Sequence, residues 1–252
     1  MLIFPFARTP LPSPSFDPAS LSPYWWSQFD PGTNWVANNK LYDLGSSGSY
    51  WYTSTTSSNA KRNSINGYCA HPFNGASYAQ FQTSGSFLSD GTTDYTLLFL
   101  AKILTYLDDA GSLLTTSHRD SKGVDFATDG IFIAHAADDI FFSFTPTSGA
   151  VVSAPITKNV YQVFGCRLNS TTMEMVPFSG ITDQTGDIMV ANSGQTNNPT
   201  LSATEDEKKN LYARGCRMDM REFWCWKSRL SDTNLFTNMI QGYINSKYGT
   251  SF

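Results

Sequence analysis

The chain has 252 residues, of which 40% are hydrophobic, 14% aromatic and only 15% charged, with a formal net charge of -4. This composition is that of a globular protein large enough to bury a core, and it excludes a disordered one. The lack of a Lys/Arg run argues against nucleic-acid binding. No apolar stretch reaches the roughly 20 residues that cross a bilayer, so no membrane span is expected.

The first 23 residues are predicted to form an extended arm, because six prolines exclude a helix or a central strand. The apolar residues between these prolines suit packing on the protein's own domain or anchoring on a partner: Phe4, Phe6, Leu11 and Phe16. The opening residues lack a basic leader followed by a long apolar stretch, so no secretory signal is expected. The sequence predicts a protein made in the cytoplasm.

From residue 24 to about residue 92 the chain is expected to form short strands between turns rich in Gly, Ser, Asn and Thr. Residues 45–64 are predicted to be a long polar loop around the aromatic triplet Tyr50, Trp51 and Tyr52. An exposed aromatic face beside amide and carboxylate groups is what glycan binding requires. The triplet is therefore the glycan-contact candidate, and the equally weighted alternative is that Trp51 packs into the edge of the sandwich.

Longer strands are predicted after residue 92. Residues 95–107 begin with a run that is apolar on both faces, as in a central strand. Two hairpins are expected, one from residues 130–137 and 140–146 around Asp138 and Asp139, the other from residues 160–168 and 172–178. Residues 179–210 are predicted to be mostly loop, and residues 216–226 to be the last long strand.

Only the C-terminal segment has a helical period, which predicts a helix over 232–247. Ser231 or Asp232 is the expected N-cap, Lys247 lies in the final turn and Gly249 is the expected stop. Gly242, inside the helix, costs about 1 kcal/mol relative to alanine, so a close packing contact is expected there.

Strands without βαβ alternation predict one all-β domain over 24–252, built as two antiparallel sheets packed face to face. Four stretches of the chain are informative together: the opening FDPASLSPYWWSQFDPG, the step YDLG, the stretch HPFNGASYAQF and the ending REFWCWKSRLSDTNLFTNMIQGYINSKYG. They resemble the concanavalin A-like lectin/glucanase superfamily in its laminin-G-like form, which is common in bacterial and phage proteins. This resemblance implies a jelly-roll sandwich of about a dozen strands closed by a C-terminal α-helix. Such a scaffold carries lectins, glycosidases and structural modules, so its site must decide the function.

The sequence gives little support for catalysis. Glycosidases of this superfamily commonly carry a Glu-x-Asp-x-x-Glu strand with two carboxylates about 5 Å apart. None of the four glutamates in this chain has that spacing. Glu222 lies where the family often has a glutamate in its last strand, and it is interpreted as a structural partner of a backbone amide or an arginine. No nucleophilic triad or phosphate-binding loop is present, so we expect no enzyme and no catalytic residues.

Metal and cysteine chemistry are also weakly supported. Calcium takes oxygen ligands from loops, and the weak candidates are Asp108, Asp109, Asp138 and Asp139, although adjacent aspartates at hairpin tips are more often turn formers. No other cofactor is expected. The four cysteines, at positions 69, 166, 216 and 225, lack zinc-ligand spacing and are expected to be reduced, mostly buried thiols. One disulfide across neighbouring strands remains an alternative.

Three functions are open from the sequence. The first is a non-catalytic virion structural protein of a tailed phage, a capsid decoration or fibre-type component at the virion surface. Its arm would contact other capsid or tail subunits in an oligomeric assembly, and its lectin-like domain would bind host-surface glycans. The second is a carbohydrate-binding or receptor-binding lectin module. The third is a glycoside hydrolase with non-standard carboxylates.

Overall fold

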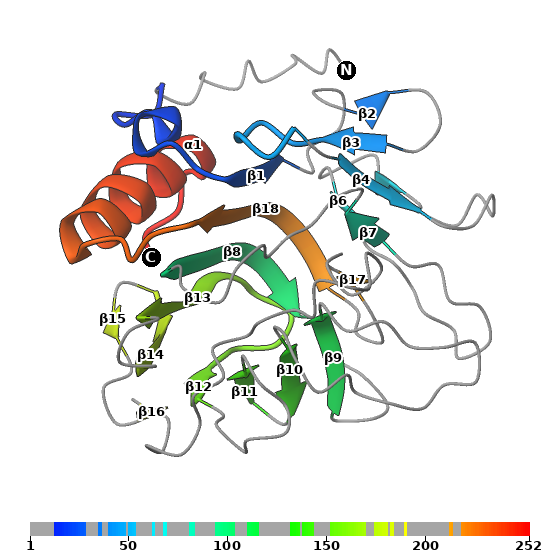
Figure 1. Ribbon diagram of the computed structural model, residues 1–252, viewed down its shortest axis with the longest axis vertical. Helices are drawn as coiled ribbons and strands as arrows, with labels where there is room; N and C mark the ends of the chain where they lie inside the picture. Colours follow the sequence, from blue (N-terminus) through cyan, green and yellow to red (C-terminus); the bar gives the residue numbers. More distant parts are fainter. Residues whose placement is uncertain are drawn as a thin grey trace, which may run out of the picture.

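The computed structural model describes residues 13–28, 35–36, 40–48, 50–53, 62–63, 68–69, 81–83, 94–103, 110–115, 132–136, 138–143, 152–169, 174–180, 182–183, 189–190, 212–213 and 218–252. These residues form a mostly β structure of antiparallel sheets with a C-terminal helix on one side (Figure 1). Among them, no helix is both long and apolar enough to span a membrane.

A seven-stranded sheet carries the helix. Its strand order is β1-β18-β8-β13-β14-β15, with β16 also paired to β14. The strands are β1 (Trp25–Gln28), β8 (Tyr95–Ile103), β13 (Tyr161–Asn169), β14 (Glu174–Ser179), β15 (Thr182–Asp183), β16 (Met189–Val190) and β18 (Met218–Trp226). The long central strands β8, β13 and β18 fix the register, because Phe99 lies opposite both Phe164 and Phe223.

A nine-stranded sheet has the order β12-β11-β10-β9-β17-β7-β4-β3-β2. Its strands are β2 (Trp35–Val36), β3 (Lys40–Tyr42), β4 (Tyr50–Thr53), β7 (Phe81–Thr83), β9 (Ala110–Thr115), β10 (Phe132–Ala136), β11 (Asp139–Ser143), β12 (Val152–Pro155) and β17 (Tyr212–Ala213). A separate pair joins β5 (Arg62–Asn63) to β6 (Tyr68–Cys69). Both predicted hairpins are confirmed, because β10 pairs with β11 and β13 pairs with β14.

Two predictions for the first half of the chain are wrong. Residues 45–64 are not one loop, because the aromatic triplet forms strand β4 and residues 62–63 form β5. The strand preference of aromatic residues outweighs the polar residues that flank them. The proline-rich arm is not extended throughout, since Pro18–Leu21 form a short 3₁₀ helix, η1. Proline is tolerated in its first turn, and the Asp17 carboxylate accepts a hydrogen bond from the Ala19 N–H at 3.0 Å.

The predicted C-terminal helix is confirmed, with a difference in winding. It consists of η5 (Thr233–Asn245), wound as a π-helix, and one further turn, α1 (Ser246–Tyr248). Of the two candidate caps, Ser231 makes the contact: its hydroxyl oxygen accepts from the Asn234 N–H at 3.2 Å. Gly249 ends the helix in a left-handed conformation with φ of 64°. The buried face consists of Leu235, Met239, Ile240, Tyr243 and Ile244.

The helix covers one face of the seven-stranded sheet. Along each strand, alternate residues point to opposite faces, and the residues packed against the helix include Leu98, Leu100, Val163, Trp224 and Trp226. The intervening residues of these strands are buried as well, so β8 is enclosed on both faces as its apolar run predicts. This double burial makes the sheet a rigid base for the side chains at its β1 edge.

Candidate functional site: a cleft beside the C-terminal helix

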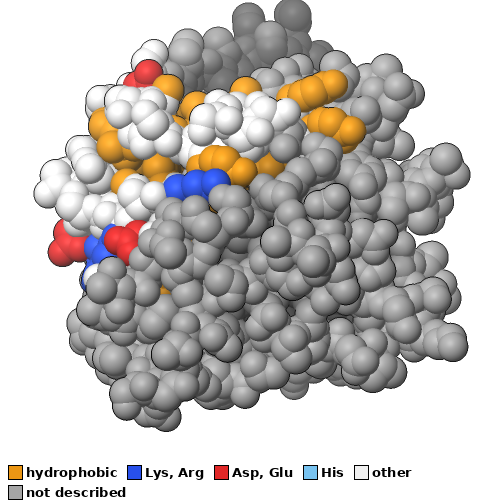
Figure 2. Space-filling view, viewed as in Figure 1, with side chains coloured by type: hydrophobic (Ala, Val, Ile, Leu, Met, Phe, Trp, Pro, Cys, Tyr) orange, Lys and Arg blue, Asp and Glu red, His pale blue; other side chains and the backbone are white. Residues whose placement is uncertain are grey.

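A cleft of about 670 Å³ opens where the N-terminal segment, strand β1 and the C-terminal helix meet. Residues 14–18 form one wall, and Trp26, Gln28, Tyr243 and Lys247 form the rest. In the described part of the face shown in Figure 2, most of the surface is hydrophobic or uncharged polar, and few side chains are charged.

Strand alternation places two β1 side chains in the cleft. Trp25 and Ser27 are fully buried on one face of β1, whereas Trp26 and Gln28 are half-buried on the other. In the β1–β18 register Gln28 lies opposite Glu222. The strand thus offers an aromatic ring and a side-chain amide on one face, next to the carboxyl of its neighbouring strand.

The N-terminal wall docks on the helix at Gly242. The Ser15 N–H and hydroxyl both donate to the Gly242 carbonyl oxygen, at 3.1 and 2.9 Å. A Cβ atom at position 242 would lie 3.1 Å from Phe16 Cβ and 3.3 Å from the Thr237 carbonyl oxygen. The close packing contact expected at this glycine is confirmed, and it is what brings the wall against the helix.

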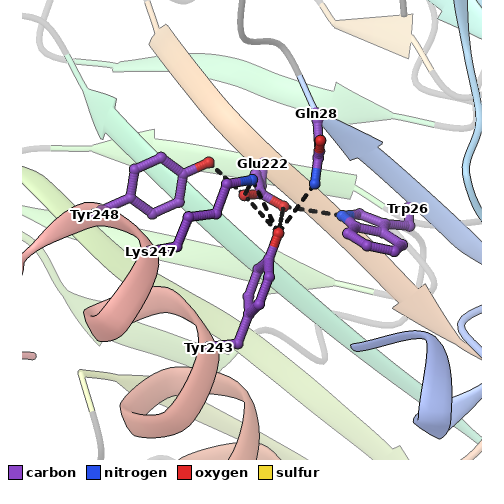
Figure 3. Close-up of polar contacts among 6 residues, drawn as sticks. All are labelled: Trp26, Gln28, Glu222, Tyr243, Lys247 and Tyr248. Atoms are coloured by element: carbon purple, nitrogen blue, oxygen red, sulfur yellow. Dashed lines mark hydrogen bonds and ion pairs between the residues drawn. The ribbon is translucent and has the colours of Figure 1, made fainter. Parts of the chain in front are cut away.

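A fully buried carboxyl, that of Glu222, contacts three of the residues that line the cleft, Trp26, Tyr243 and Lys247 (Figure 3). Lys247 Nζ donates to its Oε1 at 2.6 Å, and the Tyr248 hydroxyl contacts the same oxygen. Trp26 Nε1 donates to Oε2 at 2.9 Å, and the Tyr243 hydroxyl lies 3.1 Å from that oxygen. The expectation of a structural role holds, but the partners named for it were wrong. Among the described residues, lysine, tyrosine and tryptophan side chains contact this carboxyl, and no arginine or backbone amide does.

Burial raises the pKa of Glu222 above its usual value, and the neighbouring Lys247 ammonium is the largest effect opposing that rise. Because the carboxyl is inaccessible and both oxygens already accept hydrogen bonds, it cannot touch a ligand in the cleft. It acts on its neighbours, holding the edge of the Trp26 ring and the Tyr243 hydroxyl in place.

The surface of the cleft combines aromatic rings with several polar groups. The Trp26 ring meets the Tyr243 ring edge to face, with centroids 6.1 Å apart. Gln28 Nε2 donates to the Tyr243 hydroxyl at 3.0 Å, and the Asp17 carboxylate stands in the opposite wall. This combination fits a ligand with an apolar C–H face and hydroxyl groups at its rim.

The predicted glycan contacts lie elsewhere. Tyr50 is half-buried beside Tyr42 of strand β3, with ring centroids 5.6 Å apart, and the Tyr42 side chain is 46% exposed. Trp51 and Tyr52 belong to strand β4, but their side chains fall outside the described residues. Tyr50 is not among the residues that line the cleft, and the role of the aromatic triplet in binding stays a prediction.

Of the predicted partner anchors, Phe16 packs on the domain itself, against the helix. Phe4, Phe6 and Leu11 lie outside the described residues. The Asp138 side chain is exposed, with Lys158 at 3.8 Å, and Asp139 opens β11. The remaining calcium candidates, outside the described part, are Asp108 and Asp109.

Among the described residues no group of three or more His, Cys, Asp or Glu side chains is placed to hold a metal. Cys166 and Cys225 are buried free thiols, as the reduced state predicts. The Cys69 side chain and Cys216 lie outside the described part of the chain.

Sequence reasoning missed Trp26 and Gln28 as site residues. A signal was present, because the alternation in Trp25-Trp26-Ser27-Gln28 separates an aromatic and an amide from two buried neighbours. What the sequence did not reveal is that the N-terminal segment and the helix, far apart along the chain, would enclose this face.

No protein-family model matches the chain, and no curated protein sequence matches it. Solved structures do, beginning with the botulinum neurotoxin serotype D binding domain, at TM-score 0.59 and 11% identity over 86% of this chain and 50% of that one. The botulinum neurotoxin DC binding domain in complex with rat synaptotagmin II has TM-score 0.59 and 11% identity over 90% and 52%. The serotype D ligand binding domain in complex with N-acetylneuraminic acid has TM-score 0.53 and 11% identity over 86% and 50%. The chain spans about half the length of these chains, and the likeness shows that it shares their β-rich fold.

Proposed function

We propose that this protein is a non-catalytic carbohydrate-binding module whose ligand occupies the cleft between β1 and the C-terminal helix. The observation that carries the proposal is the convergence of the half-buried Trp26 ring with the Gln28 amide and the Asp17 carboxylate in one open cleft. A sugar ring stacks its C–H face on an aromatic ring and directs its hydroxyls to groups of this kind.

The chemistry of Glu222 supports binding in place of hydrolysis. A retaining glycosidase needs two carboxylates that both reach the glycosidic bond. Glu222 is fully buried beneath Trp26 and Tyr243 and is paired with Lys247, so it supports the site without contacting a substrate. Together with the missing glutamate motif, this arrangement favours a binding protein.

The structural neighbours support the same class. They are binding domains solved with N-acetylneuraminic acid and with rat synaptotagmin II, so a scaffold of this shape carries ligand sites of both kinds. We infer in addition that the two sheets form a concanavalin A-like jelly roll, supported by the closing strand β18 and the helix that follows it. The virion role, the phage origin and the surface location remain hypotheses from the sequence, and the neighbours bear on binding alone.

A glycan array followed by calorimetry on the strongest ligand tests the proposal, with an expected affinity in the millimolar to micromolar range. Trp26→Ala is expected to weaken binding by at least about tenfold, because it removes the stacking face. Trp26→Phe keeps an aromatic ring but loses the hydrogen bond from the indole N–H to Glu222. It therefore distinguishes the contribution of stacking from that of this hydrogen bond. Tyr42→Ala is the matched control, an exposed aromatic residue away from the cleft.

Two outcomes would contradict the proposed function or the proposed position of the site. If no glycan binds, the proposed function is wrong. If Trp26→Ala binds normally while Trp51→Ala does not, the function stands, but the site moves to strand β4.

A further inference from the structure

The cleft offers a ligand two hydrogen-bond acceptors to which no described residue donates. Tyr243 donates its hydroxyl hydrogen to Glu222 and accepts from Lys247 Nζ at 2.9 Å. Gln28 must therefore direct its NH₂ group at the Tyr243 oxygen, which fixes the orientation of the amide. Its carbonyl oxygen receives no hydrogen bond from any residue that the structure describes, so it is available to a ligand.

The opposite wall offers the same kind of group. One carboxylate oxygen of Asp17 accepts from the Ala19 N–H at 3.0 Å. The other oxygen accepts no bond from the described part of the chain. Pro14 and Pro18, on either side in this wall, have no backbone N–H to offer.

Several donors around the cleft are engaged within the protein, although the NH₂ group of Gln28 has a second N–H besides the one that it directs to Tyr243. Trp26 Nε1–H points to Glu222, and the Ser15 hydroxyl donates to the Gly242 carbonyl oxygen. Lys247 donates two of its three N–H groups, one to Glu222 and one to Tyr243, and its ammonium lies 2.6 Å from the Glu222 carboxyl. A carboxylate or sulfate on a ligand would accept hydrogen bonds only, and it would lie near the Asp17 carboxylate.

We infer that the cleft selects neutral saccharides over acidic ones, because hydroxyl groups can donate to Gln28 Oε1 and Asp17, whereas an anionic group cannot donate and is repelled by the Asp17 carboxylate. This inference rests on the proposed function and narrows its ligand class. The ligand is a neutral sugar that stacks on Trp26 and donates at least two hydroxyl hydrogens across the cleft.

Matched oligosaccharide pairs test this selectivity with the full chain: one member neutral, the other carrying a sialic acid or a sulfate on the same core. Calorimetry is expected to give affinities at least about tenfold higher for the neutral member, roughly the effect of one hydrogen bond lost and one acceptor left facing an anion. Analogues of the neutral ligand that each lack one hydroxyl group test the donors. We expect weaker binding when either of the two hydroxyls that donate across the cleft is removed.

Asp17→Asn tests the mechanism. Asparagine retains the oxygen that caps η1 but replaces the second acceptor by a donor. The variant is expected to keep its melting temperature while the preference for the neutral member shrinks by at least about threefold, a fraction of one hydrogen bond. Asp138→Asn makes the same change at an exposed site on the β10–β11 turn and should leave the preference intact.

The outcomes separate the two proposals. Equal or tighter binding of the acidic members overturns the selectivity and leaves the carbohydrate-binding function in place. An Asp17→Asn variant whose preference does not change also overturns it. Binding of neither class overturns the proposed function and the inference with it.

Discussion

Lys247→Met removes the cation that accompanies the buried carboxyl under the cleft. The ammonium lies 2.6 Å from Glu222 Oε1, with the lysine side chain 23% exposed and the glutamate side chain 0% exposed. Removing one member of a buried ion pair costs about 3–5 kcal/mol, because the other charge stays buried without compensation. The partial exposure of the lysine places the expected loss of unfolding free energy near the lower end, about 3 kcal/mol at pH 8.

The loss should depend on pH. Burial raises the pKa of Glu222 above its usual 4.5, and Lys247 opposes that rise, so the variant has a still higher pKa at this carboxyl. A carboxyl with a raised pKa in the folded state contributes stability that is complete below the unfolded value and disappears as pH rises through the folded value. The stability of the variant should therefore fall more steeply than that of the wild type above pH 4.5, and the deficit at pH 4 should be under about 1 kcal/mol.

Urea denaturation of both proteins at pH 4 and pH 8 measures this difference. Lys158→Met is the matched control, since its partner Asp138 has a side chain that is 84% exposed and lies 3.8 Å away. That change should cost less than about 1 kcal/mol. A deficit of equal size at both pH values, or none at pH 8, would refute the role of the buried pair.

Two further predictions concern the sheet. Gly165→Ala should lower the free energy of unfolding by at least about 3 kcal/mol or prevent folding, because a Cβ atom there would overlap the Leu97 carbonyl oxygen and the Phe178 ring. Thermal melts followed by circular dichroism would measure the loss. A melting temperature like that of the wild type would contradict this packing. Cys166 and Cys225 should resist alkylation in the native protein and react once it is unfolded, because both are buried and burial raises the pKa of the Cys225 thiol. Peptide mass spectrometry measures the modification. If either thiol is modified in the native protein, the burial of that thiol is disproved.

Local patterns predicted much of the fold. The apolar run at the start of β8 indicated a strand buried on both faces, and the helical period with its cap and stop glycine indicated the closing helix. Gly242 even predicted a close contact before the contacting segment was known. These features depend on neighbouring residues, whose preferences the sequence displays directly.

The cleft depends on register and could not be found in this way. Trp26 and Gln28 become site residues only because β1 pairs with β18, which places Gln28 opposite Glu222, 194 positions along the chain. The error over residues 45–64 has a related cause, because polar composition suggested a loop while pairing with β3 and β7 made Tyr50–Thr53 a strand.

The contact of Ser15 with Gly242 joins positions 227 residues apart, and it has a consequence for synthesis. A ribosome makes the N-terminal wall of the cleft long before it makes the helix that receives this wall. Until the helix has been made, the wall has nowhere to dock, and the Trp26 ring lacks the lysine and tyrosines that hold its surroundings. Competence to bind thus arises only once the helix has been made, so ligand capture would distinguish chains that have folded around it from shorter nascent ones.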